Sequence, residues 1–229
     1  MIEPTIHSII LQDVKPKKIL IISDTHSGVF HDVDKVIEFE KPDFILLSGD
    51  IIDDKEEKDD WDNILIWLKQ LNQKVPVIAS LGNHDVKAGL DVLLPKLNDT
   101  GIMVLDNNFI KIDDLFIYGY TPELFNSPKH LTNFPVEKDK TIVLCHRPED
   151  FYETELLNES FALTISGHCH GGQWRFFGRG IYAPGQGFFP KYTSGFYFNN
   201  KLFITRGLSN KNWPRRINNK SEIVILNIN

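Results

Sequence analysis

Two histidines one residue apart, His168 and His170, are the residues of this sequence best suited to chemistry. They follow an apolar run, residues 161–165, that predicts a short buried strand, and glycines flank them. Side chains on alternate residues of an extended segment leave the same face, so both imidazoles can reach one small region. Imidazole is a common metal ligand. The pair indicates a metal site, with a polar loop holding two unrelated histidines as the alternative at this point.

Four other predicted strands end in polar residues of the same kind. Continuous apolar runs predict buried strands at 19–22, 44–47, 75–79 and 141–144. Open α/β sheets bind ligands at the carboxyl ends of their strands, so the residues that follow are candidates for a shared site. The five strand ends supply Asp24, His26, Asp50, Asn83, His84, His146, His168 and His170. Five of the eight histidines fall in this set, which favours a metal site over incidental structural histidines.

The elements that must position these residues alternate between strands and helices. Helical spacing of apolar residues predicts helices over about 32–40, 61–71 and 89–97. Short strands at 102–105, 109–112 and 115–118 predict an antiparallel meander in a second sheet, and closing strands are expected near 196–198, 202–205 and 222–226. With neither an internal repeat nor a linker in the sequence, we expect one α/β domain over residues 1–229.

Composition narrows the class of protein. The chain has 229 residues and 41% hydrophobic content, enough for one substantial core. It has no run of about twenty apolar residues to span a membrane, and its first residues lack the pattern of a secretory signal. The two cysteines suggest no disulfide scaffold. We expect a cytoplasmic protein, with peripheral membrane contact as an extension of that expectation.

Charge is distributed unevenly along the chain. The net charge is −6, yet residues 171–220 contain nine Lys and Arg and no Asp or Glu. The remaining residues carry 16 basic and 31 acidic side chains, a balance of −15. The basic segment is suited to anions, and Arg206 and Arg216 are candidates for phosphate contact. A flap that covers the core with a solvated basic rim is the alternative.

Aromatic residues are interleaved with these cations. Phe188-Phe189-Pro190 is suited to a membrane interface beside basic charges, which predicts contact with an anionic membrane. Basic and aromatic surface also suits single-stranded nucleic acid. The acidic remainder of the chain argues against an extended nucleic-acid footprint. The sequence identifies no protein partner.

The strand-end residues resemble, in order, the five motifs of the calcineurin-like metallophosphoesterases: Asp24-x-His26, Gly49-Asp50, Gly82-Asn83-His84-Asp85, His146 and Gly167-His168-x-His170. Residues 171–173, 182–185 and 206–208 resemble the YkuE-like branch of that family. The resemblance implies a two-layer sandwich of mixed β-sheets flanked by helices, with a dimetal site at the carboxyl ends of the strands.

The resemblance also implies roles for individual residues. One metal would be held by Asp24, His26, Asp50 and His170, and the other by Asp50, Asn83, His146 and His168, with Asp50 bridging. His84 would not ligate but would protonate the leaving oxygen. Asp85 would either orient His84 or cap a helix. Imidazole ligands favour Mn, Fe or Zn over Mg and Ca, and we expect two Mn ions with Fe or Zn as alternatives.

The function implied is a metal-dependent phosphoesterase that acts on a phosphomonoester, phosphodiester or pyrophosphate. In such a centre two metals activate a bridging water as hydroxide and clamp the phosphoryl oxygens. The YkuE-like resemblance suggests a lipid-linked or envelope-related substrate. A nuclease or cyclic-nucleotide phosphodiesterase is the alternative within enzymes, and a non-catalytic metal-binding interaction module is the alternative outside them.

Overall fold

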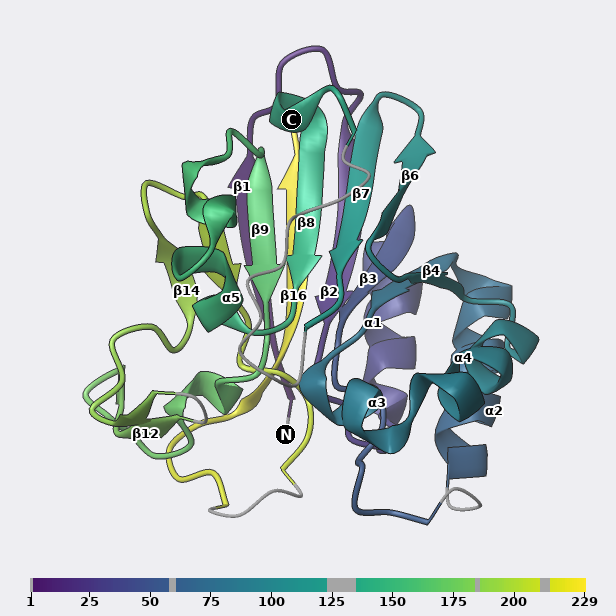
Figure 1. The fold of residues 1–229 in the computed structure, drawn as a ribbon, viewed down its shortest axis with the longest axis vertical. Helices are drawn as coiled ribbons and strands as arrows, with labels where there is room; N and C mark the ends of the chain where they lie inside the picture. The colour runs from purple at the N-terminus through teal and green to yellow at the C-terminus, as the bar shows by residue number, and fades with distance from the viewer. Residues whose placement is uncertain (1, 58–60, 123–134, 184–185, 211–214) are drawn as a thin grey trace.

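Two six-stranded sheets pack face to face in the computed structural model, which describes residues 2–57, 61–122, 135–183, 186–210 and 215–229 (Figure 1). The first sheet has the order β1 (Ile2–Ile9), β16 (Ser221–Ile228), β2 (Lys17–Ile22), β3 (Phe44–Ser48), β4 (Val77–Ser80), β5 (Met103–Leu105). The second has the order β14 (Gly195–Tyr197), β15 (Leu202–Ile204), β9 (Leu163–Ser166), β8 (Thr141–Cys145), β7 (Leu115–Tyr120), β6 (Asn108–Ile112). The predicted two-layer α/β fold is confirmed.

Each sheet is mixed, with a parallel run of four strands. These runs are β2 to β5 in the first sheet and β7, β8, β9 and β15 in the second. The predicted meander is wrong in one respect, because β5 pairs in parallel with β4 and belongs to the first sheet. Only β6 and β7 of that group form an antiparallel pair in the second sheet. A three-residue strand carries too little pattern to specify its partner.

Alternating side chains divide the core into layers. Ile19 and Ile21 of β2 point between the sheets, where they join Ile142 and Ile165 of the second sheet in one cluster. Leu20 of β2 belongs to the cluster on the opposite face. That face packs against α1 (His31–Glu40), α2 (Asp62–Lys74) and α4 (Leu90–Asp99), while α5 (Pro148–Tyr152) packs on the outer face of the second sheet.

The two parallel runs aim their carboxyl ends at one end of the sandwich. In Figure 1 the arrowheads of β7, β8 and β9 point toward the end where α3 (Asn83–Ala88) and β12 (Tyr182–Ala183) lie. Helix α3 was not predicted, and it begins at a candidate ligand, Asn83. No helix in the described ranges is both long and apolar enough to cross a bilayer. That residues 1–229 make a single domain stays a prediction.

Candidate metal centre

The predicted site residues lie together where the two sheets end. Asp24 and His26 follow β2, Asp50 follows β3, and His146 follows β8. Across the sheets, the Nε2 atom of His146 lies 2.9 Å from Oδ2 of Asp50 and 3.9 Å from Oδ1 of Asp24. The Nε2 atoms of His26 and His170 lie 3.3 Å apart. Residues separated by more than a hundred positions in sequence thus meet in one buried polar cluster.

Four overlapping groups of potential metal ligands occur among the described residues, and two of them include His84: His26 with Asp50 and His84, and Asp53 with Asp54 and His84. The other two groups contain the predicted ligands alone. Asp24, His26 and His170 form one, and Asp50, His146 and His168 form the other, each with ligand atoms within 4.8 Å of one another. His168 and His170, whose spacing could have brought both to one ion, therefore lie in different groups. The Nε2 atom of His26 lies 3.9 Å from Oδ2 of Asp50, so Asp50 faces both groups. This division matches the ligand sets implied by the family resemblance.

The chemistry of the donors fits divalent metal ions. Oδ1 of Asn83 is buried and has no hydrogen-bond partner among the described residues. A buried oxygen without a partner is costly, and a metal ion would satisfy it. The two Nε2 atoms of His26 and His170 face each other at the separation expected of two ligands of one ion. Two carboxylates and four imidazoles complete a donor set typical of Mn, Fe or Zn.

The lowered pKa values of three of the four imidazoles also favour ligation. Burial, followed by the charge of His146, lowers the pKa of His168 to about 3. Burial likewise lowers the pKa values of His26 and His170. These three rings are neutral at physiological pH, the form that ligates metal. Burial opposes the charge on His146, but Asp50 and Asp24 outweigh it and raise the pKa of His146 to about 10.

Backbone geometry marks the same residues. Asp24, His26, Asp50, His168 and His170 all have φ between 43° and 66°. Side-chain-bearing residues rarely adopt this left-handed conformation, which costs on the order of 1–3 kcal/mol each and persists where the surroundings enforce it. Five occurrences at five candidate ligands indicate that the fold holds these side chains for a purpose other than stability.

Neighbouring backbone groups orient the ligands. Nδ1 of His146 donates to the carbonyl of Ser48 at 2.8 Å, which leaves Nε2 facing Asp50. Oδ1 of Asp24 accepts the backbone N–H of His168 at 3.0 Å. Oδ1 of Asp50 accepts the backbone N–H of His84 at 2.9 Å. The loops after β2, β3, β4, β8 and β9 are therefore linked to one another through the ligands.

Asp85 joins two of these loops. Its carboxylate accepts N–H groups of Ile51 at 2.9 Å, Ile52 at 3.0 Å and Gly82 at 2.7 Å. Burial and the nearby charge of Asp50 raise the pKa of Asp85 to about 7 against these three donors. Of the two predicted roles for Asp85, the structure shows the cap, because the bond to Gly82 lies at the start of α3.

The carboxylate that contacts His84 is Asp54, which sequence reasoning missed. Nδ1 of His84 bonds to Oδ1 of Asp54, with Oδ1 of Asp53 at 3.8 Å, and Nε2 lies 4.0 Å from Oδ2 of Asp50. A proton held on Nδ1 by Asp54 leaves Nε2 to face the metal centre. In sequence Asp54 lies in an acidic run that reads as solvated surface, and only the acidic composition of that run hinted at it.

Comparison with known proteins agrees with the geometry. A family model for calcineurin-like phosphoesterases matches residues 17–172, which include every candidate ligand. The chain belongs to this family. It is 28% identical to a metallophosphoesterase of Campylobacter jejuni over 93% of this chain, and spans 59% of that protein's length. It is 27% identical to the metallophosphoesterase YkuE of Bacillus subtilis (all of this chain, 86% of YkuE) and 26% identical to the phosphodiesterase YaeI of Escherichia coli (93% and 82%).

The two arginines predicted to contact phosphate, Arg206 and Arg216, have different surroundings in this metallophosphoesterase. Nη2 of Arg206 lies 2.8 Å from Oε2 of Glu3 and 3.2 Å from Oε1 of Glu222, and its side chain is 14% exposed. These carboxylates occupy the guanidinium and raise its pKa against the effect of burial. The ion pairs give Arg206 the role of joining β1 and β16 to the loop after β15, and its phosphate contact stays a prediction.

Arg216 lies beside the metal centre. Its Nη2 atom is 3.4 Å from Nδ1 of His170, and its Nε donates to the carbonyl of Ser209 at 2.9 Å. Burial lowers the pKa of Arg216 to about 10. Nη1 is buried and makes no hydrogen bond within the described ranges. Phosphate contact by Arg216 stays a prediction.

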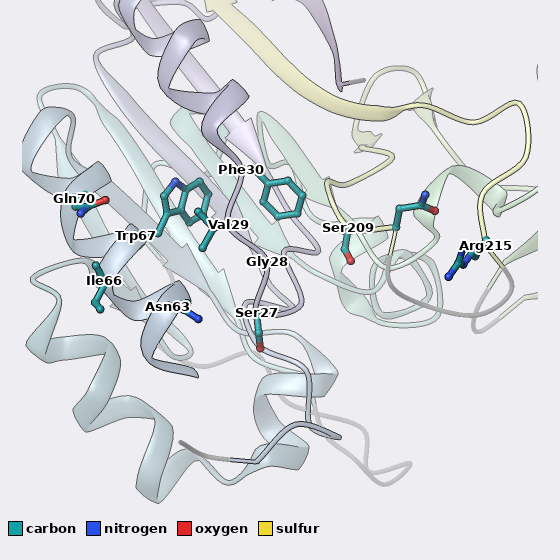
Figure 2. Close-up of a pocket in the computed structure, with 11 residues that line it drawn as sticks. Ser27, Gly28, Val29, Phe30, Asn63, Ile66, Trp67, Gln70, Ser209 and Arg215 are labelled. Atoms are coloured by element: carbon teal, nitrogen blue, oxygen red, sulfur yellow. The ribbon is translucent and has the colours of Figure 1, made fainter. Parts of the chain in front are cut away.

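A cleft of about 970 Å³ opens next to the centre (Figure 2). Ser27 in its wall follows the candidate ligand His26 directly, and Phe30 lies four residues after His26. In Figure 2 the Phe30 ring lies between the side chains of α2, which include Trp67, and Ser209 on the opposite side. Asn63 and Gln70 of α2 and Arg215 of the far wall add polar groups. The cleft offers apolar and polar surface to whatever is attached to a phosphate at the centre.

Proposed function

We propose that this metallophosphoesterase hydrolyses phosphate esters, phosphodiesters foremost, at a centre of two divalent metal ions, with Mn the expected metal. The observation that carries the proposal is the division of the buried cluster into two ligand groups that Asp50 faces together. Two divalent ions held by these groups would supply an activated hydroxide and charge stabilisation for in-line displacement at phosphorus. The E. coli relative described as a phosphodiesterase supports the choice of diester.

The residues of the chain would then divide the work. Asp24, His26, Asp50 and His170 would hold one ion, and Asp50, Asn83, His146 and His168 the other. The side chain of His84 is 19% exposed and lies at the edge of the cluster. There its Nε2 can give a proton to the leaving oxygen. Asp54 would keep that ring oriented. The cleft lined by Phe30, Trp67 and Asn63 would receive the alcohol portion of the ester.

A lipid-linked ester is the substrate class we favour. The cleft beside the centre carries exposed apolar side chains, Ile66 at 56% and Val29 at 37% exposure. Arg215 on the far wall could pair with a second phosphate, as a pyrophosphate-linked lipid would require. A nucleotide would use Asn63 and Gln70 instead, so substrate tests must include both classes.

The test begins with metal. The protein is stripped with a chelator, its metal content measured by mass spectrometry, and Mn, Fe or Zn restored one at a time before assays with aryl phosphomonoester and aryl phosphodiester. We expect two ions per chain and diester turnover that returns with Mn. Single-stranded oligonucleotide, cyclic nucleotide and a nucleotide-linked lipid precursor follow as natural candidates. Two bound ions with no turnover of any substrate would favour the non-catalytic module, and turnover that survives complete metal removal would overturn the proposal.

A further inference from the structure

Two short hairpins project beyond the last candidate ligand. β10 (Arg175–Phe176) pairs with β11 (Arg179–Gly180), and β12 pairs with β13 (Gly187–Phe188). Ile181 joins the hairpins, because its N–H donates to Trp174 and its carbonyl accepts from Phe189, both at 2.7 Å. Figure 1 shows β12 at the end of the molecule toward which β8 and β9 point. The hairpins thus occupy the same end of the sandwich as the metal centre.

These hairpins expose phenylalanine rings to solvent. Phe176 is 51% exposed, Phe177 105%, Phe188 67% and Phe189 81%. In the part of the chain that the structure describes, one other phenylalanine, Phe39 of α1, is exposed to this degree. Single exposed apolar residues are ordinary, but four aromatic rings within fourteen residues form a concentration that marks an interaction surface.

The backbone gives an independent sign. Phe177 has φ of 50° and Phe189 has φ of 57°, the left-handed conformation that glycine or asparagine adopts most readily at a turn. A bulky aromatic residue there is unfavourable, and its ring gains no burial in return, since both rings project into solvent. The stability of the fold therefore does not explain these two phenylalanines.

Cations lie directly beside the rings. A groove of about 520 Å³ is lined by Arg175, Arg179 and Lys191, with Phe189 in its wall. Arg175 is held in place by bonds to Gly171 at 2.7 Å and to the Ser194 hydroxyl at 2.8 Å. Arg179 and Lys191 are exposed. Since residues 171–220 contain no Asp or Glu, the segment that carries the hairpins is complementary to an anionic surface.

We propose that the two hairpins dock this protein on an anionic lipid bilayer. The rings of Phe176, Phe177, Phe188 and Phe189 enter the membrane interface, and Arg179 and Lys191 contact lipid phosphates. The residues outside 171–220 carry a balance of −15, so the positive charge that an anionic bilayer would attract is concentrated in the segment of the hairpins. The metal centre then faces the membrane, where a lipid-borne phosphate ester would be presented to it.

Vesicle co-sedimentation tests the docking without any measurement of turnover, so its result is separable from that of the proposed function. Wild-type protein is mixed with vesicles of phosphatidylcholine alone or with phosphatidylglycerol added, at low and high salt. We expect binding to the anionic vesicles that weakens with salt. Absence of binding to anionic vesicles at low salt, or equal binding to the neutral ones, would overturn the proposal.

Matched variants locate the surface. Phe177→Ser with Phe189→Ser should lower the partition coefficient roughly tenfold or more, whereas Phe39→Ser, an equally exposed ring on α1, should leave it unchanged. Arg179→Glu with Lys191→Glu should abolish binding, whereas the same reversal at Lys35 and Lys69 should have a small effect. Circular dichroism confirms folding of each variant. Equal losses of binding in the test and control variants would contradict a specific docking face. Protein that self-associates through the phenylalanines and does not bind vesicles would contradict it as well.

Discussion

The metal centre and the two hairpins place unfavourable backbone conformations in opposite settings. In the centre, left-handed residues such as Asp24 and Asp50 carry buried polar side chains that neighbouring strands and loops fix in place. In the hairpins, the left-handed residues Phe177 and Phe189 carry apolar rings that point into solvent. Both regions depart from the ordinary distribution of residues in a folded protein. The metal centre buries polar side chains, and the hairpins expose apolar ones. The difference suggests that one region acts on a ligand drawn inward and the other on a surface outside the protein.

The largest effect should come from removing one charge in the centre. Asp50→Asn preserves the size of a side chain that faces both ligand groups but removes the charge that two cations need. We expect aryl phosphodiester turnover to fall by more than the roughly 10²–10³-fold lost with a single transition-state donor, and bound metal to fall with it. Steady-state kinetics and metal analysis measure the two losses. Asp113→Asn, an exposed acid paired with Lys17, is the control that should keep both.

The substitution His84→Asn should lower turnover almost as much as Asp50→Asn does, but without loss of bound metal. His84 lies at the edge of the cluster and is absent from the two ligand sets that the family resemblance implies, although its ring also lies within ligand distance of His26 and Asp50. Loss of a general acid lowers turnover by roughly 10²–10⁴-fold. Metal content equal to that of the wild type separates this role from ligation. If the variant loses an ion, His84 is a ligand and the assignment of two groups must be redrawn.

The metal centre could be predicted from the sequence because the candidate ligands follow continuous apolar runs. The strands at 19–22, 44–47, 75–79, 141–144 and 161–165 are confirmed as β2, β3, β4, β8 and β9, within two residues at either end. Such runs suit strands buried on both faces, and a parallel topology brings their carboxyl ends together. That is why the cluster itself could be anticipated from one chain.

Features that depend on tertiary contact could not be read in the same way. The ion pair of Arg206 could not be anticipated, because its partner Glu3 is 203 positions away in sequence. Asp54 resembled solvated surface because its contact with His84 depends on how the loop after β3 meets α3. The predicted membrane surface lay in a basic, aromatic segment whose exposure only the fold reveals.

Asp54 should have a smaller effect than His84, because it acts through that ring. Asp54→Asn keeps a hydrogen-bonding oxygen but loses the charge that orients and stabilises a protonated imidazole, and we expect roughly a 10-fold fall in kcat with KM little changed. The discriminating measurement is a double-mutant cycle. In the His84→Asn background the Asp54 change should cost nothing further. A full additional loss there would show that Asp54 acts on the centre independently of His84.

A last prediction compares the two regions by their stability. Gly49, before the ligand Asp50, and Gly178, in the first hairpin, have similar left-handed φ of 72° and 78°. Alanine at either position therefore pays the same backbone cost of about 1 kcal/mol. At Gly49 the new Cβ would also lie 2.7 Å from the ring of His146, whereas at Gly178 it would meet nothing within 4 Å. Overpacking of that kind adds about 1–3 kcal/mol. Urea unfolding of the metal-loaded protein should show Gly49→Ala as the more destabilised variant by that margin, and equal free energies of unfolding would mean that the centre yields as readily as the hairpins.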